Sequence, residues 1–268
     1  MFTAVDIFSL IALGMVAGTL GGLLGIGGSM IMIPVLTLFL GRDQHLSQAT
    51  AMIVNVFVAA PAAWQHHRNN AVRWDVFRVM LPVAAVAILI GVAASNQLDG
   101  SVLRRIFGAF LLYMVVLNVT RLIRGRPQPS LDEQRTGAAR TGSVGGIMGF
   151  MAGLLGIGGG GIAVPLMQRV CHLPLRQSIA TSSAVMCLSA GLGAIHKNAS
   201  LAMNPALAGA DSAGIALESL AIAGVLIPTA IVGGLLGSTL THRLPLTVVQ
   251  VVFILLLSWV SLQMLGLV

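Results

Sequence analysis

The chain has 268 residues, of which 56% are hydrophobic and 9% are charged, and its mean hydropathy is +0.94. A soluble domain carries about 25% charged residues, so this composition excludes an ordinary soluble protein and indicates an integral membrane protein. The net charge of +7 does not indicate a nucleic-acid-binding protein, because the basic residues stand singly or in small groups between apolar runs, where membrane proteins carry them.

The first apolar run spans residues 7–24, and the only charge before it is Asp6. A cleavable signal would begin with a basic region, so we expect this run to remain as a membrane helix. Gly-Ile-Gly-Gly follows at 25–28, and a second apolar run spans 29–40. One helix over 7–40 would be about 50 Å long, whereas the hydrocarbon core is about 30 Å thick. The alternative is a hairpin whose second arm returns to the starting side.

The rest of the chain alternates apolar runs with short polar segments, and a bilayer span needs roughly 20 apolar residues. We therefore expect an all-α polytopic membrane protein. The predicted organisation is a first repeat at 1–123, a polar cytoplasmic linker at 124–142 and a second repeat at 143–268. The later apolar runs, in chain order, are 49–64, 79–94, 106–120, 143–155, 161–167, 179–195, 217–240 and 247–268.

The two repeats are visible as an internal duplication. Residues 22–28 recur letter for letter at 153–159, 131 positions later, and Pro34 recurs as Pro165. Each repeat is therefore predicted to have about four apolar segments, the first of them broken by glycine into a re-entrant-like pair. Paired interruptions of this kind in the two halves of a membrane protein indicate a transport site.

The distribution of Lys and Arg separates the single-crossing alternative from the hairpin alternative. A single crossing in both repeats divides these residues 9 to 6 between the two sides, and a hairpin divides them 11 to 4. The positive-inside rule favours the more asymmetric arrangement. We therefore expect two repeats of inverted topology, a cytoplasmic linker and both termini outside. The four residues on the outer side are then Arg42, Arg104, Arg105 and Lys197.

The glycines of the duplicated motif fall into two groups. Small residues four apart lie on one helical face and let helices approach closely in lipid, which is the expected role of Gly14, Gly18, Gly22, Gly145, Gly149 and Gly153. Three glycines in four residues instead predict a turn, whose free N–H groups at the start of the next helix suit an anion. The alternative is a turn needed only for folding. The predicted substrate-binding residues here are Gly25, Gly27, Gly28, Gly156, Gly158 and Gly159, with Ser29 as a helix cap and Gly160 at the matching place.

Polar side chains within the apolar runs extend this candidate site. Asn55 lies inside a predicted span, where a carboxamide needs a hydrogen-bond partner. Thr50, Thr181, Ser182 and Ser183 lie near the starts of their predicted helices. Their hydroxyl groups either bind anion oxygens or cap the helices, and the sequence does not separate these two roles.

Histidine and basic residues stand at the ends of the same predicted helices. They are His67 and Arg68 in the first repeat and His196 and Lys197 in the second. One interpretation is an ordinary membrane-interface position, which suits cations at a helix C-terminus. The other is a relay for protons or anions, because histidine titrates near neutral pH.

The doubled Gly-Leu-Leu-Gly-Ile-Gly-Gly motif with its following proline, at 22–34 and 153–165, resembles the TauE/SafE family of sulfite exporters. This resemblance implies a secondary carrier in the plasma (inner) membrane for a small anion such as sulfite, a sulfonate or another sulfur-containing or organic anion. An anion channel and a membrane assembly protein are the alternatives. No nucleophile with a base and no metal-ligand cluster stands out, so we expect no enzyme, cofactor or metal. The expected partners are the lipid bilayer, the anion and protons as coupling ion; a homo-oligomer is left open.

Overall fold

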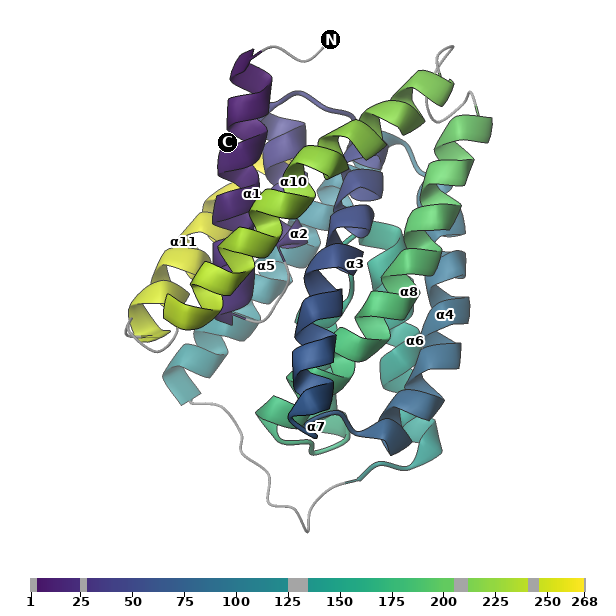
Figure 1. The fold of residues 1–268 in the computed structure, drawn as a ribbon, viewed down its shortest axis with the longest axis vertical. Helices are drawn as coiled ribbons and strands as arrows, with labels where there is room; N and C mark the ends of the chain where they lie inside the picture. The colour runs from purple at the N-terminus through teal and green to yellow at the C-terminus, as the bar shows by residue number, and fades with distance from the viewer. Residues whose placement is uncertain (1–3, 25–27, 125–134, 205–211, 241–245, 268) are drawn as a thin grey trace.

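A computed structural model describes residues 4–24, 28–124, 135–204, 212–240 and 246–267 (Figure 1). The described part of the chain is helical and contains no strand, as the composition predicted. Its elements are α1 (Ala4–Leu24), α2 (Ser29–Pro34), a π-helical turn η1 (Val35–Phe39), α3 (Gln44–Arg68), α4 (Trp74–Asn96), α5 (Gly100–Arg124), α6 (Ala138–Leu155), α7 (Gly160–Val170), α8 (Leu175–Met203), α10 (Ser212–Leu240) and α11 (Leu246–Leu265).

Five helices of the described chain are long and apolar enough to cross a membrane, namely α3, α4, α8 and the segments Gly100–Ile123 and Ala213–Leu236. Shorter apolar helices accompany them, and large apolar side chains such as Phe8 and Leu255 point outward. An apolar exterior around a helical bundle suits lipid, where helix association depends on close packing. The chain is therefore an integral, multi-pass membrane protein.

The glycine stripes pack helices against one another, as predicted. α1 lies along α10, and α6 lies along α4. A Cβ atom placed on Gly18 would lie 2.3 Å from the Ala230 carbonyl oxygen, and one on Gly149 would lie 2.4 Å from that of Ala84. Only glycine allows backbones this close. An added Cβ on Gly145 or Gly153 would likewise meet a backbone carbonyl oxygen, of Met80 or Ile88, and one on Gly14 would meet the Thr229 side chain; the surroundings of Gly22 lie outside the description.

α3 and α8 run antiparallel through the middle of the bundle (Figure 1). Lys197 near the end of α8 bonds to His45 at the start of α3, and Gly193 faces Met52 one to two turns further along. The start of α3 therefore lies opposite the end of α8, and the two helices run in opposite directions. This pair forms the wall against which the broken helices pack.

The chain turns back between α6 and α7. The backbone N–H of Arg135, just before α6, donates to the carbonyl of Cys171, just after α7, at 2.9 Å. The end of α7 therefore lies beside the start of α6. In the first half Gly28 lies against Ala17, so the chain returns along α1 there too.

Two boundaries differ from those expected. α6 begins at Ala138, inside the predicted linker, and α8 continues to Met203, beyond the predicted apolar run that ends at residue 195. The first extension begins with two alanines, and the second contains alanine, leucine and methionine, which favour helix over loop. The second extension matters most, because it carries the end of α8 past Lys197.

Candidate functional site

The second glycine turn is a buried reversal of the backbone. Gly156, Gly158 and Gly159 have φ of +77°, +68° and +80°, in the left-handed region that other residues adopt only with strain. The N–H of Gly156 closes α6 on the Ala152 carbonyl at 2.9 Å. The first α7 backbone bonds are those of Ile162 and its successor to the Gly159 carbonyl. As in any helix, the N–H groups before them are left without an intrahelical partner.

α3 and α8 close over this turn. Asn55 Nδ2 donates to the Gly156 carbonyl at 3.4 Å, which supplies the partner that a buried carboxamide requires. A Cβ atom on Gly158 would lie 2.7 Å from Asn55 Nδ2 and 3.0 Å from Met186 Sδ. Asn55 and Met186 occupy matching positions in the duplicated sequence. The turn therefore has one polar wall from α3 and one sulfur-containing apolar wall from α8.

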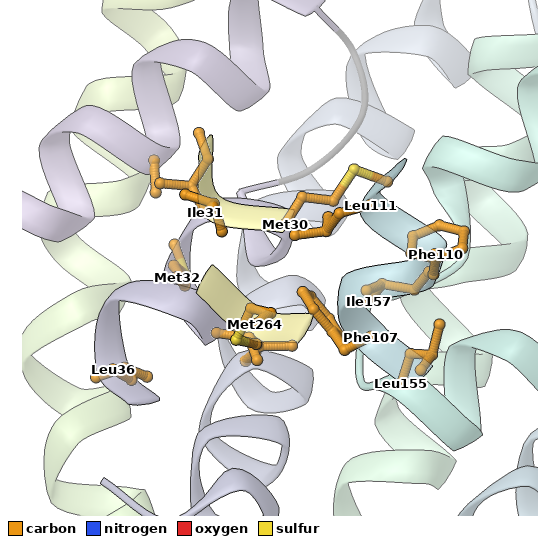
Figure 2. Close-up of a cluster of buried hydrophobic side chains, with 14 of the residues drawn as sticks. Met30, Ile31, Met32, Leu36, Phe107, Phe110, Leu111, Leu155, Ile157 and Met264 are labelled. Atoms are coloured by element: carbon orange, nitrogen blue, oxygen red, sulfur yellow. The ribbon is translucent and has the colours of Figure 1, made fainter. Parts of the chain in front are cut away.

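The start of α2 meets the turn from the other half of the chain. Ser29 Oγ donates to the Ile157 carbonyl at 3.0 Å, so the prediction that Ser29 caps its own helix is wrong. Gly28 has φ of −77°, an ordinary helical value. Gly25 and Gly27 lie outside the described residues. Figure 2 shows Met30 and Ile157 in one apolar cluster with Phe107. The buried starts of α2 and α7 are thus brought together at the centre.

Two of the four predicted hydroxyl residues bond to backbone groups far away in the sequence, and two bond to their own helix. Thr50 Oγ1 donates to the Ser219 carbonyl at 3.4 Å, and Thr181 Oγ1 accepts from the Arg73 N–H at 3.1 Å. Ser182 and Ser183 both donate to the carbonyl of Ile179 on their own helix. Ser182 and Ser183 both lie one turn before Met186 on α8, and of the two only Ser182 is fully buried. Thr181 is tied to the end of the bundle where α4 begins.

Lys197 is wholly buried, so the interpretation of this residue as an ordinary membrane-interface lysine is wrong. Its Nζ lies 2.9 Å from His45 Nδ1, 2.7 Å from Ser95 Oγ and 2.8 Å from Asn96 Oδ1. These partners come from α3 and α4, which pack on α8. The other ring nitrogen of His45 also has a hydrogen-bond partner, because Nε2 lies 3.1 Å from the Leu98 carbonyl oxygen.

A chain of hydrogen bonds connects Lys197 with the glycine turn. Ser95 Oγ donates to Gln48 Oε1 at 3.1 Å, and Gln48 Nε2 donates to the Leu154 carbonyl, in the last turn of α6, at 3.1 Å. Gln48 also lies against Gly156, where an added Cβ would come within 2.9 Å of its side chain. We call Lys197, His45, Ser95, Asn96 and Gln48 the lysine network.

Sequence reasoning missed most of this network, although one signal for it exists. Lys197 is the only lysine in the chain, and every other basic residue is an arginine. A charged side chain inside the membrane is energetically costly, so a lone lysine in an apolar segment is a functional candidate for that reason alone. His45, Ser95 and Gln48 carry no comparable signal, because helix pairing alone brings them together.

The other relay candidates lie outside the network. His67 and Arg68 are exposed at the end of α3. The His67 ring contacts Trp64 at 6.3 Å and Trp74 at 5.4 Å between centroids, an aromatic grouping typical of the membrane interface. His196 is half-buried beside Lys197 in sequence but does not take part in the described hydrogen bonds of the network.

The described residues contain no group of three or more His, Cys, Asp or Glu placed to hold a metal ion. Cys171, in the connection after α7, is buried, and burial raises the pKa of its thiol. A thiol with a raised pKa stays protonated at neutral pH and is a poor nucleophile. This position therefore offers no sign of a reactive cysteine.

Comparison with known proteins places these features in a family. The family model described as "Sulfite exporter TauE/SafE" matches residues 10–264. The chain is 26% identical to the probable membrane transporter protein MamO of Paramagnetospirillum magneticum over 98% of its own length, but spans only 45% of that protein. It is also 26% identical to the probable membrane transporter protein YunE of Bacillus subtilis, covering 92% of this chain and 93% of that protein. No solved structure matches.

Proposed function

The chain belongs to the sulfite exporter TauE/SafE family of membrane transporters, and we propose that it is a secondary carrier for a small anion in the plasma (inner) membrane. Sulfite or a sulfonate is the proposed substrate class. The observation that carries the proposal is the meeting of the buried turn at Gly156–Gly160 with Asn55 and Ser29 between α3 and α8.

The proposed substrate site is this turn together with the first Gly-Ile-Gly-Gly segment, at residues 25–28. An isolated charge at the bilayer centre costs at least about 2.5–3.5 kcal/mol, so an anion there needs converging donors. The N–H groups at the start of α7 and the Asn55 carboxamide are donors of the right kind, and oriented N–H groups favour negative charge. Ser182, which is buried one turn before Met186, is the hydroxyl proposed to contribute, whereas Thr181 and Ser183 are proposed to have structural roles.

The proposed architecture is two repeats of inverted topology. Its support is that α3 and α8, which match in the duplication, run antiparallel, while the first helix of each half packs along a helix of the other half. The start of α10 lies beside Arg42 through its ion pair with Glu218. The end of α11 lies beside the start of α5. Because α1 runs parallel to α10, the start of α1 and the end of α11 are then on one side and the proposed linker on the other.

The proposed linker side is cytoplasmic. Many arginines stand at helix ends on the side of the bundle where α5 ends and α6 begins, and the cytoplasmic side carries the excess of basic residues. They include Arg68, Arg73, Arg78, Arg121, Arg140, Arg169 and Arg176. A reporter that is active only in the cytoplasm, fused to the C-terminus, should give no signal. A strong signal would contradict the proposed orientation.

Exchange of [³⁵S]sulfite across proteoliposomes tests the function directly. A carrier should show saturable uptake that is accelerated by unlabelled sulfite inside, a result that a pore does not give. Large non-saturating currents would instead make the protein an anion channel. Protein-free liposomes supply the leak to be subtracted. Thermal stabilisation of the purified protein by sulfite, thiosulfate, sulfonates and carboxylates would rank the substrates.

A further inference from the structure

The buried ammonium of Lys197 is held by uncharged groups. Its three partners are a histidine nitrogen, a hydroxyl and a carboxamide oxygen. Among the described residues, no carboxylate oxygen lies within 4.0 Å of Nζ. A cation buried in a membrane protein without an ion pair is costly and marks a functional position.

The hydrogen positions in the lysine network follow from its geometry. The Leu98 carbonyl can only accept, so His45 Nε2 carries a hydrogen and, in the neutral ring, Nδ1 presents a lone pair to Nζ. The Ser95 hydroxyl hydrogen points to Gln48, so its oxygen also accepts from Nζ. Three acceptors match the three N–H bonds of an ammonium group. The arrangement is that of protonated Lys197.

Loss of one proton from Lys197 Nζ changes this arrangement at the hydrogen bond between Ser95 and Gln48. A neutral amine has two N–H bonds and a lone pair, so one of the three acceptors would face a lone pair. Ser95 can resolve the conflict by turning its hydroxyl hydrogen from Gln48 to Nζ. A hydroxyl has only one hydrogen, so Gln48 Oε1 then loses its donor. Gln48 is the residue that holds the Leu154 carbonyl beside Gly156.

We propose that Lys197 is the proton-binding group of coupled transport and that Ser95 and Gln48 pass its protonation state to the glycine turn. This inference rests on the proposed anion transport. One H⁺ binds the Nζ lone pair and converts the amine to an ammonium group, and release is the reverse step. A proton that moves with each monovalent anion leaves the translocated charge at zero.

The charged groups around the network suit this role. Asp43, exposed just before α3, accepts from the N–H groups of His45 and Leu46, and Asp99 follows α4. On α10, Glu218 is paired with Arg42. α6 and α7 contribute no titratable residue at this end of α8. Negative charge nearby but not in contact attracts protons while leaving Nζ free to release them.

A single lysine allows a direct measurement. Full-length protein with ¹⁵N-labelled lysine, in detergent, gives one side-chain Nζ resonance. We expect it to change reversibly between the ammonium and amine positions within a titration from about pH 5 to 10. Ser95→Ala should retain this titration, because it removes the hydroxyl and not the amine. A resonance that stays at the ammonium position throughout would overturn the inference.

The transport test uses [³⁵S]sulfite in proteoliposomes with and without a pH gradient. With one proton per anion, one unit of pH difference drives about tenfold accumulation in the wild type. Lys197→Gln cannot bind the proton, and Lys197→Arg cannot release it. Both should keep sulfite exchange at equal pH but lose the tenfold accumulation. Arg68→Gln, which lies outside the lysine network, should keep the tenfold accumulation.

The outcomes separate this inference from the proposed function. Exchange absent from the wild type means that the proposed function fails, and the proton inference with it. Wild-type exchange with no effect of the pH gradient, or tenfold accumulation retained by Lys197→Gln, overturns only the proton inference. Should the Lys197 variants fail to fold, Ser95→Ala decides: it should exchange sulfite without accumulating it, and full accumulation would overturn the inference.

Discussion

The ends of α3 and α8 carry the same short pattern with opposite outcomes. His67-Arg68-Asn69 ends α3 in an exposed turn, whereas His196-Lys197-Asn198 lies within α8, and Lys197 is wholly buried. α3 stops at Arg68, and Asn70 turns the chain with φ of +50°. α8 continues to Met203. A few more helical residues thus convert a basic residue at the interface into one inside the bundle.

This contrast teaches that the duplicated halves share packing but not polar chemistry. The glycine stripes give equally close contacts in α1 and α6. The polar positions differ, because Asn55 matches Met186 and the exposed Arg68 matches the buried Lys197. Four comparisons of variants test where the halves are equivalent and where they are not.

The largest loss of stability is expected from substitutions in the glycine stripes of α1 and α6. Gly149→Ala and Gly18→Ala would each force a methyl group to about the same short distance from a backbone carbonyl, 2.4 Å and 2.3 Å. Overpacking of this kind costs typically 1–3 kcal/mol, and backbone atoms yield least, so we expect a loss of about 3 kcal/mol from each. Thermal unfolding in detergent measures it. Gly146→Ala, whose nearest atom is a Val83 methyl at 3.6 Å, is the control. A loss confined to one half would show that the packing is not equivalent.

The next largest effect, on stability and on sulfite exchange, is expected at the second glycine turn, Gly156–Gly160. Gly158→Ala combines a left-handed φ with a contact to Asn55 Nδ2, for which we expect about 2 kcal/mol of destabilisation and a loss of sulfite exchange. Gly160→Ala meets only Met186 Sδ, at 3.4 Å, and should fold normally. Normal folding together with normal exchange in Gly158→Ala would mean that the turn is not the substrate site.

Asn55→Met makes the first half match the second. It removes the donor to the Gly156 carbonyl, and a buried carbonyl without its partner costs about 1–3 kcal/mol, toward the low end for a bond of 3.4 Å. We expect a modest drop in melting temperature and a higher KM for sulfite. Met186→Leu conserves volume and should cost less than about 1.5 kcal/mol. An unchanged KM in Asn55→Met would remove Asn55 from the proposed site.

The smallest effect is expected at Arg68. Its side chain is exposed, so Arg68→Gln should change the free energy of unfolding by no more than about 0.5 kcal/mol. Unfolding of this variant and of Lys197→Gln, measured side by side, compares the two equivalent positions. Equal losses would show that Lys197 is no more embedded than Arg68.

The sequence predicted what depends on local pattern and missed what depends on pairing. Apolar runs predicted the long helices, and glycines four apart predicted the close contacts at Gly18 and Gly149, because both features lie on a single helix. The role of Ser29 was wrong since its acceptor, Ile157, lies 128 residues away. Lys197 likewise meets His45 across 152 residues. No local pattern encodes such contacts.

The helix boundaries show the same limit on a smaller scale. The repeat pattern equates the end of α3 with a position inside α8, and a duplicated sequence gives no reason to expect different lengths. The alanine and leucine residues after Lys197 decide in favour of helix. The longer helix buries Lys197 inside the bundle. A position-by-position comparison of the two halves could not predict this burial.

The scarcity of lysine has a consequence for orientation in the bilayer. Guanidinium groups remain protonated at every physiological pH, and the enzymes that acetylate lysine do not neutralise them. Apart from the histidines, every basic side chain other than Lys197 is an arginine, so the arginine contribution to the charge difference between the two ends of the bundle is constant. Alkaline stress and lysine acetylation leave that contribution unchanged. The protein thus keeps its permanent charges where they set its insertion and confines its one titratable primary side-chain amine to the interior.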